Sequence, residues 1–584
     1  MTYRAPVADI VFSLEHAAGF EAALAEGLYG DLGEELIHAV LAEAGRFATE
    51  VLSPLNRIGD RQGAEFNDGL VTTPPGWKEA YRAWTKAGWN AVAAPQEWGG
   101  QNLPRAVNAA CVEMWNSAAM AFGIAPVLTM SAVEALLAHG SEDLRRAYLP
   151  KLVSGAWMGT MQLTEPQAGS DVGLLRTKAE RAQDGSYRIT GQKIFITYGE
   201  HDLTDNIVHM VLARLPNAPP GTRGVSLFLV PKFVLDPDGS PGPRNDVRAH
   251  SIEHKLGIHA SPTCTMVFGD AGGATGYLVG EENRGMACMF TMMNPARLAV
   301  ALQGVGLAER ATQQALAYAR ERRQGGGGAG PQPIILYPDV KRMLLTTRAL
   351  TRAARAICYA AAVALDRAER ASDPAAREEA HARASLLTPI AKAFATDIAI
   401  EVASLGIQVH GGMGYIEETG AAQHYRDARI AAIYEGTNGI QAIDLVTRKL
   451  PLAGGTAVKN YIRALKHRAA TIAAANDPGF GATGARLAET VAGLERATDW
   501  LLATPRKDAA LAGATPYLRL FAYAAGGTML AEEALAAARG APDAAAPARV
   551  AIARFFAENI AVAANGLERA VVAGADSIND AALD

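Results

Sequence analysis

The chain has 584 residues, 49% of them hydrophobic, and a formal net charge of −5. The length suggests about four domains, each large enough to bury a core. The small net charge gives no electrostatic case for binding nucleic acid or an anionic membrane. The four cysteines are widely spaced, so we expect free thiols, no metal site and a reducing compartment. Neither a signal peptide nor an uncharged apolar run of about 18 residues is evident. We therefore expect a cytoplasmic protein without an integral membrane segment.

Helical periodicity dominates the first part of the chain. Residues 1–33 precede the first strong helical pattern and are expected to form an N-terminal arm. Residues 34–160 are expected to form a helical domain, with helices over 34–51 and 133–152. Short β-branched segments bounded by Gly and Pro then predict a domain of antiparallel hairpins over 161–282.

The rest of the chain returns to helical periodicity. Residues 283–450 contain long amphipathic stretches, separated by four glycines (325–328) that predict a flexible tip. Residues 451–584 are rich in alanine, with apolar stripes at helical spacing, and predict an additional helical domain. The order helical, β, helical, helical indicates an α+β protein and not an alternating βαβ fold.

Two segments of the β-region carry residues suited to a flat, phosphate-bearing cofactor. In the loop 161–171, Gly169 and Ser170 let backbone N–H groups and a hydroxyl approach a phosphate, and Thr164 offers a hydroxyl to a polar ring edge. In the strand 191–197, Phe195 and Thr197 share one face, which suits a heteroaromatic ring. Taken singly, an ordinary polar loop and a core Phe in a hairpin explain these patterns as well.

Two further segments lie in the second helical region. The glycine-rich run after Gln408 could contact a pyrophosphate, but it follows a helix and so is not a Rossmann fingerprint. Its His410 is interpreted as structural. Glu435 stands on a glycine-flanked loop beside Tyr434, and a carboxylate in a dry cleft gains the raised pKa that a general base needs. Without the other segments, Glu435 would be interpreted as a surface residue at a helix start.

Together these motifs resemble the acyl-CoA dehydrogenase family over residues 34–450. The sequences TEPxAGSD, GxKxxIT and YEGTNxIQ match, and Gln408 stands 27 residues before Glu435. The resemblance implies an FAD enzyme with an N-terminal helical domain, an antiparallel β-barrel domain and a C-terminal four-helix domain. In this chain an extra C-terminal helical domain follows.

The resemblance also implies roles for individual residues. Glu435 is implied as the catalytic base, and Ala296 stands where some members carry the base instead. Substrate contacts are implied for Arg297, Tyr434 and Gly436. FAD contacts are implied for Leu163, Thr164, Gly169, Ser170, Phe195, Thr197, Arg322, Gln408, Gly412 and Thr437. Of these, Arg322, Gln408 and Gly412 resemble residues that serve the neighbouring subunit's FAD. The resemblance implies a dimer or a tetramer, and we expect a homodimer. The residues Gln324, Tyr337 and Pro338 depart from the family's usual pattern, so contacts to the adenine end stay open.

The implied activity is FAD-dependent α,β-dehydrogenation of an acyl-CoA thioester, with electrons passing to an electron-transfer flavoprotein. The N-terminal arm and the added C-terminal domain resemble the long forms that act on 3-methylmercaptopropionyl-CoA. We therefore expect that substrate or short- to medium-chain acyl-CoAs. A long-chain dehydrogenase and an acyl-CoA oxidase using O₂ are the enzymatic alternatives. A monooxygenase fits less well because it generally lacks the loop glutamate, and a non-catalytic protein that keeps the fold is the alternative from another class.

Overall fold

A computed structural model describes residues 3–583 apart from 327–329, 476 and 541–544. Gly327 and Gly328 of the predicted flexible tip lie outside the described residues. The chain forms two compact units, each described here by itself. The helical unit comprises Met1–Ala48, Pro104–Ala118 and Arg297–Asp584, and the β-unit comprises Thr49–Leu103 and Ala119–Ala296.

The main sheet of the β-unit has eight strands, in the order β10-β11-β5-β12-β7-β6-β3, with β4 paired to both β5 and β6. Because β5 also pairs with β12, the strands β5, β12, β7, β6 and β4 are hydrogen-bonded in a cycle whose last link is the single pair Lys178–Arg214. The strands are β3 (Met158–Gln162), β4 (Lys178–Arg181), β5 (Tyr187–Thr197), β6 (Ile207–Arg214), β7 (Val225–Pro231), β10 (Val247–Ile252), β11 (Thr263–Phe268) and β12 (Ala274–Val279).

The expectation of purely antiparallel hairpins is wrong at two places. The pairs β3–β6 and β4–β6 are parallel, whereas the other pairs in this sheet are antiparallel. The β4–β5 hairpin lies between β3 and β6 in the sequence and supplies the crossover that a parallel pair requires. Hairpin signals in a sequence report neighbouring strands and do not reveal such a crossover.

The β-unit contains further helices and short strands besides this sheet. They are α4 (Leu55–Gln62), α5 (Trp77–Lys86), α7 (Glu142–Val153) and the short strands β1 (Glu65–Asn67), β2 (Leu70–Thr72), β8 (Phe233–Leu235) and β9 (Pro241–Arg244). Helix α6 (Arg105–His139) contributes to both units and departs from helical geometry at Ala119, where the division between the units falls. The single helix expected over 133–152 is wrong. Gly140 interrupts it, and Ser141 caps α7 by accepting a hydrogen bond from the N–H of Leu144.

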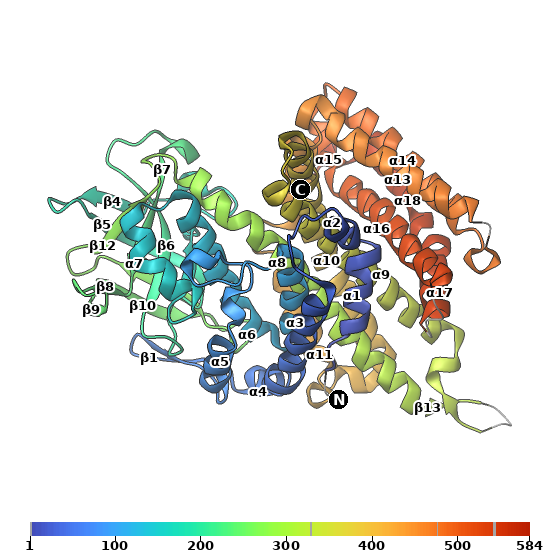
Figure 1. Cartoon of the computed structure of the whole chain (residues 1–584), viewed down its shortest axis with the longest axis horizontal. Helices are drawn as coiled ribbons and strands as arrows, with labels where there is room; N and C mark the ends of the chain where they lie inside the picture. The colour runs from blue at the N-terminus through green and yellow to red at the C-terminus, as the bar shows by residue number, and fades with distance from the viewer. Residues whose placement is uncertain (1–2, 327–329, 476, 541–544, 584) are drawn as a thin grey trace. The chain divides into compact units, whose positions relative to one another are not determined.

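The helical unit contains the long helices α9 (Pro338–Arg370) and α10 (Pro374–His410) and, from Arg297 onward, most of α8 (Gly285–Glu321), whose first residues belong to the β-unit. The short strands β13 (Arg323–Gln324) and β14 (Gln332–Pro333) lie between α8 and α9. The short helices α11 (Ala421–Ala428) and α12 (Asn438–Asp444) follow. The C-terminal helices pack around α16, which also contacts α9, α10 and α12 (Figure 1). They are α13 (Thr456–Ala474), α14 (Thr483–Ala503), α15 (Lys507–Ala512), α16 (Ala514–Arg539), α17 (Ala546–Phe555), α18 (Ala564–Ala573) and α19 (Ala575–Asn579).

The N-terminal arm is helical and well anchored. It contains α1 (Val7–His16) and α2 (Phe20–Ala25) and leads to α3 (Glu34–Phe47). Asp9 forms ion pairs with Arg352 of α9 at 2.6 Å and with Arg549 of α17 at 2.9 Å. One carboxylate therefore joins the start of the chain to two helices that lie far along the sequence.

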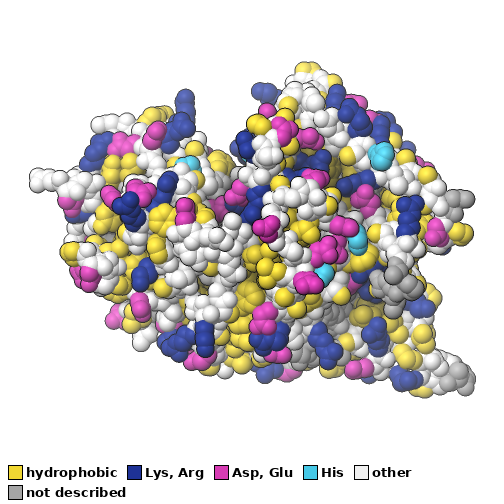
Figure 2. Space-filling model, viewed as in Figure 1, with side chains coloured by type: hydrophobic (Ala, Val, Ile, Leu, Met, Phe, Trp, Pro, Cys, Tyr) yellow, Lys and Arg dark blue, Asp and Glu magenta, His cyan; other side chains and the backbone are white. Residues whose placement is uncertain are grey.

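Two helical stretches in the described part of the chain are long and apolar enough to cross a membrane, namely Arg105–His139 and Ala546–Ala573. In the first, 83% of the apolar window is buried, as in the core helix of a folded domain. In the second, 33% of the apolar window is buried, and a π-helical and a 3-10 segment over Phe556–Ala563 separate α17 from α18. Basic and acidic side chains are interspersed over the visible surface, in keeping with the small net charge (Figure 2).

A buried ion pair joins three helices of the helical unit. Arg355 of α9 donates to Glu113 of α6 at 2.6 Å and to Glu309 of α8 at 2.9 Å, and the hydroxyl of Tyr359 donates to Glu113 at 2.5 Å. Arg355 and Glu113 are both almost fully buried. Removing one partner of such a pair leaves an uncompensated charge in the core.

We expect Arg355→Met to destabilise the helical unit by about 3–5 kcal/mol, because Glu113 keeps its charge and loses its main partner. Calorimetric unfolding checks this. The matched control is Arg486→Met, whose partner Glu489 is 2.8 Å away on the exposed surface of α14, and we expect a loss of less than about 1 kcal/mol there. Equal losses in the two variants would contradict the prediction.

Candidate active site

The loop 433–437, called here the Glu435 loop, has an unusual backbone conformation. It precedes α12, and both Glu435 (φ 56°) and Gly436 (φ 83°) occupy the left-handed region. A residue other than glycine with positive φ is uncommon and must be held by its surroundings. Glycine is needed at position 436, because a Cβ there would lie 2.8 Å from the side-chain nitrogen of Gln441.

Side chains from two helices fix this turn. Gln441 of α12 donates through Nε2 to the carbonyl oxygens of Glu435 (3.2 Å) and Gly436 (3.3 Å). Lys392 of α10 donates to the same Gly436 oxygen at 2.9 Å. Thr437 caps α12, since its hydroxyl accepts from the N–H of Ile440 at 3.3 Å. The backbone N–H of Glu435 makes no hydrogen bond within the described part of the chain, so a donor stands next to the carboxylate.

The electrostatic setting of Glu435 suits a base. Burial raises the pKa of Glu435 above its usual value, while the charges of Arg297 and Lys392 counteract that rise. Arg297 is buried on α8, with Nη1 4.0 Å from the carboxylate of Asp444. A carboxylate with a raised pKa beside positive charges can accept a proton near neutral pH and remain ionised beforehand.

The neighbouring aromatic side chain is also fixed to α8. The hydroxyl of Tyr434 hydrogen-bonds the amide oxygen of Gln303, which is fully buried. Arg297 and Gln303 both belong to α8, so a single helix supplies two of the side chains that interact with the Glu435 loop.

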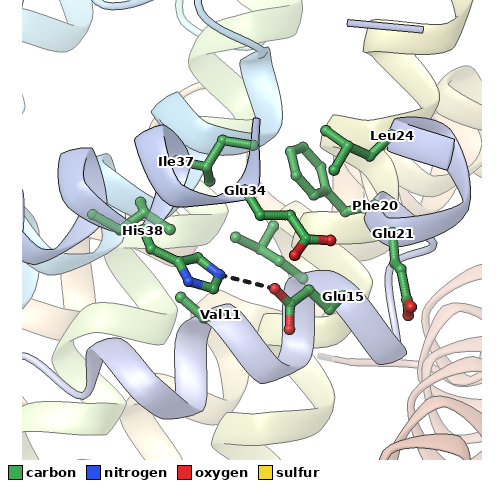
Figure 3. A pocket seen from close by; sticks show the side chains of 10 residues that line it. Val11, Glu15, Phe20, Glu21, Leu24, Glu34, Ile37 and His38 are labelled. Atoms are coloured by element: carbon green, nitrogen blue, oxygen red, sulfur yellow. Dashed lines mark hydrogen bonds and ion pairs between the residues drawn. The ribbon is translucent and has the colours of Figure 1, made fainter. Parts of the chain in front are cut away.

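An open hollow of about 740 Å³ adjoins this loop within the helical unit. It combines carboxylates, one guanidinium and the end of the loop, so it offers polar contacts. Its lining consists of Asp397, Ile400, Glu401, Ser404, Tyr425, Arg429, Ala432, Ile433, Thr437, Asn438 and Gly439. A second hollow, among α1, α2 and α3, has a volume of about 10 Å³, and His38 lies 3.0 Å from Glu15 at its edge (Figure 3). That volume holds about one water molecule, too little for a cofactor or substrate.

The β-unit brings a second group of predicted residues together. The loop after β3 lies against β5, because the N–H of Ile194 donates to the carbonyl of Thr164 at 2.9 Å. Lys193, fully buried, donates to the carbonyl of Leu163 at 3.0 Å and to Glu165 at 2.8 Å. Burial alone would raise the pKa of Glu165, yet Lys193 and further hydrogen bonds lower it to about 2. Burial lowers the pKa of Lys193 to about 8 despite this partner.

A β-bulge turns Phe195 outward. The register between β5 and β11 shifts between Cys264 and Met266, and Phe195 adopts a φ of 59° at that point. Its side chain is 59% exposed, whereas Ile196 beside it is buried and Thr197 is half-buried. Bulges commonly redirect a side chain next to a functional site. Phe195 therefore offers a free aromatic surface beside the Thr164 loop.

The other predicted contacts are accessible or structural. Gly169 and Ser170 are exposed, and a Cβ on Gly169 would meet nothing within 4 Å. In the helical unit, Arg322, Gln408 and Gly412 are exposed. His410 is buried and its Nδ1 lies 2.7 Å from the carbonyl of Gly406, which is a structural arrangement.

The structure thus groups the predicted residues within each unit. Glu435, Tyr434, Gly436, Thr437 and Arg297 lie together in the helical unit, and Leu163, Thr164, Phe195 and Thr197 lie together in the β-unit. Sequence reasoning missed the side chains that hold these loops: Lys193, Glu165, Gln303, Lys392 and Gln441. A lysine inside an otherwise apolar helical run, as in residues 389–394, is the signal that could have identified Lys392.

Comparison with models of known protein families gives matches over most of the chain. The sequence matches the acyl-CoA dehydrogenase N-terminal domain over 34–156, the middle domain over 160–271 and the C-terminal domain over 283–450. Residues 464–582 match the description "Acetyl-CoA dehydrogenase C-terminal like".

Individual relatives extend this similarity. The chain is 46% identical to 3-methylmercaptopropionyl-CoA dehydrogenase of Ruegeria pomeroyi, covering 100% of both chains. It is 36% identical to a butyryl-CoA dehydrogenase of Syntrophomonas wolfei, covering 81% of this chain and 79% of that one. The structure of an acyl-CoA dehydrogenase from Bacillus anthracis complexed with FAD shares the fold, with a TM-score of 0.74, 20% identity and coverage of 94% and 89%.

The fold and site are therefore those of a flavin-dependent dehydrogenase. The chain belongs to the acyl-CoA dehydrogenase family, and its cofactor is FAD. The residues present fit that cofactor: the exposed Phe195 offers a surface for a flat ring, and the open approach at Gly169 and Ser170 suits a phosphate.

Glu435→Gln tests the cost of burying this carboxylate. Because the folded pKa of Glu435 is raised, its contribution to stability is fully present below the usual value of 4.5 and is lost as pH rises through the folded pKa. The neutral amide avoids that loss. We therefore expect the FAD-loaded variant to have a higher Tm than wild type at pH 7.5, with the difference shrinking toward pH 4.5. The control Glu418→Gln, at an exposed position, should leave Tm unchanged at both pH values. A lower Tm for Glu435→Gln at pH 7.5 would argue against a buried, destabilised carboxylate.

Proposed function

We propose that this chain dehydrogenates 3-methylmercaptopropionyl-CoA and short- to medium-chain acyl-CoA thioesters, with Glu435 as the base. The observation that carries the proposal is Glu435 itself: a carboxylate with a raised pKa on a strained turn, with its own backbone N–H available beside it.

The chemistry follows from these groups. The Glu435 carboxylate takes the α-proton, and its backbone N–H stabilises the negative charge that develops on the thioester oxygen. Bound FAD supplies the acceptor for the hydride that leaves the β-carbon. The acyl-CoA thus loses one proton and one hydride and becomes the 2-enoyl-CoA. Arg297 helps to keep Glu435 ionised before the proton is transferred.

Leu163, Thr164, Gly169, Ser170, Phe195, Thr197 and Thr437 are proposed to hold the FAD, and Arg297, Tyr434 and Gly436 to contact the substrate. An electron-transfer flavoprotein is the proposed electron acceptor. The proposed location is the cytoplasm, since all four cysteines are buried free thiols that suit a reducing compartment.

The substrate range rests on the named relatives and on the similarity of a thioether to a methylene group. A pocket discriminates one methylene group by only about 1–3 kcal/mol. A site that accepts the methylthiopropionyl group should therefore also accept butyryl or hexanoyl groups. No observation on the described residues favours the long-chain or oxidase alternatives.

Anaerobic flavin bleaching with 3-methylmercaptopropionyl-, butyryl-, octanoyl- and palmitoyl-CoA tests the proposal. We expect wild type to be reduced by the first three, and Glu435→Gln to bind FAD but to be reduced at least ~10³-fold more slowly, since an amide cannot accept the proton. Near-normal reduction of Glu435→Gln would exclude Glu435 as the base. A kcat/KM for palmitoyl-CoA more than about tenfold above the others, or about 1.4 kcal/mol, would assign a long-chain enzyme instead. Rapid reoxidation by O₂ would assign an oxidase.

A homodimer is also proposed, because Arg322, Gln408 and Gly412 are exposed in the helical unit and resemble residues that serve a neighbour's FAD. We expect light scattering to give twice the chain mass of 61.3 kDa for the FAD-loaded protein. We expect weaker association once FAD is removed, since a ligand shared between subunits stabilises their assembly. A stable FAD-bound monomer would contradict the proposal.

A further inference from the structure

Lys392 is a buried lysine that contacts the Glu435 loop. It lies in α10 among buried apolar residues such as Ile390 and Phe394, and Lys392 itself has no exposed surface. Lysine is almost never fully buried unless it is paired. Here its Nζ donates to the carbonyl oxygen of Gly436 and to the side-chain oxygen of Asn438, each at 2.9 Å.

Asn438 links Lys392 to Thr396 and Asp397, which lie one turn further along the same helix, α10. Its amide nitrogen donates to the hydroxyl of Thr396 at 2.9 Å and to the carboxylate of Asp397 at 2.6 Å. Asn438 is also the first residue of α12. The loop is therefore bound to α10 at Gly436, directly after Glu435, and again where it enters α12.

A few charged side chains around Lys392 and Glu435 influence the pKa values of these two residues. Glu435, Asp397 and Arg297 act on Lys392, and Lys392 and Arg297 act on Glu435. Burial lowers the pKa of Lys392 to about 7, although Glu435 and Asp397 favour its charged form. A positive charge near a carboxylate lowers the pKa of that carboxylate by about 1–3. Removing the Lys392 charge should therefore raise the pKa of Glu435 further.

We infer that Lys392 is a positioning residue for dehydrogenation: it holds the left-handed turn that orients Glu435, and its charge helps to keep that carboxylate ionised. The inference rests on the proposed role of Glu435. A side chain that served only the packing of α10 would not need one polar contact to the Glu435 loop and a second to the first residue of α12. Nor would its loss change the pH at which the base becomes active.

Lys392→Met keeps the length and volume of the side chain and removes its charge and donors. In the FAD-loaded full chain, we expect flavin reduction by butyryl-CoA to slow about 100-fold at pH 7.5, the cost of misplacing a reacting group by about 1 Å, with little change in the apparent KM. The acid limb of the pH profile should move up by at least about one pH unit. Lys507→Met, at an exposed lysine of α15, is the control and should match wild type in both respects.

Asn438→Ala provides the second variant and decides the matter if Lys392→Met fails to fold. It removes one acceptor of Lys392 but leaves the charge in place. We therefore expect slower flavin reduction with an unmoved acid limb. A wild-type rate in Asn438→Ala, or a wild-type acid limb in Lys392→Met, overturns the inference.

Glu435→Gln in the same assay separates this failure from that of the proposed function. If Glu435→Gln is reduced at nearly the wild-type rate, the proposed base is wrong. If Glu435→Gln is inactive while Lys392→Met and Asn438→Ala behave as wild type, only the positioning role is wrong.

Discussion

The left-handed turn at Glu435 and Gly436 is the constraint on which the rest of the site depends. Two consecutive residues with positive φ turn their carbonyl groups toward Gln441 and Lys392, which bind them. Each such residue other than glycine costs about 1–3 kcal/mol, so the surrounding helices must stabilise the turn. In return, the turn leaves the backbone N–H of Glu435 without a hydrogen bond in the described part of the chain, next to the carboxylate of the same residue.

In the β-unit, too, a buried lysine holds a loop in place by donating hydrogen bonds to it. Lys193 is buried and donates to the carbonyl of Leu163, as Lys392 donates to that of Gly436. Burial lowers the pKa of both lysines. Removing an ammonium group from water costs several kcal/mol, and a hydrophobic residue would often be more stable there. An ammonium group, however, donates several hydrogen bonds from one atom, which fixes a loop where regular secondary structure has ended.

Much of the fold and the glycine-flanked Glu435 loop of the candidate site could be predicted from the sequence. The helical stretches within 283–450 and the glycine-flanked Glu435 loop depend on local patterns, and such patterns survive folding unchanged. The parallel pairing of β3 with β6 could not be predicted, because it depends on which strands pair in the fold and not on the sequence pattern within either strand. Lys392 and Gln303 escaped for the same reason: they lie 43 and 132 residues from Glu435 in the sequence. Their roles depend on helix packing, to which a single sequence gives no direct access.

The ion pairs of Asp9 affect the order in which parts of the protein can form their final contacts during synthesis. Asp9 binds Arg352 and Arg549, and the second partner lies 540 residues further along the chain. At about 5–20 residues per second, a ribosome needs roughly 30–110 s to reach it after making Asp9. For most of that time the first helix has been synthesised but lacks the surface on which it finally rests. Helix α1 therefore makes its final contacts only after most of the described chain has been synthesised, although it is made before the helices that it contacts.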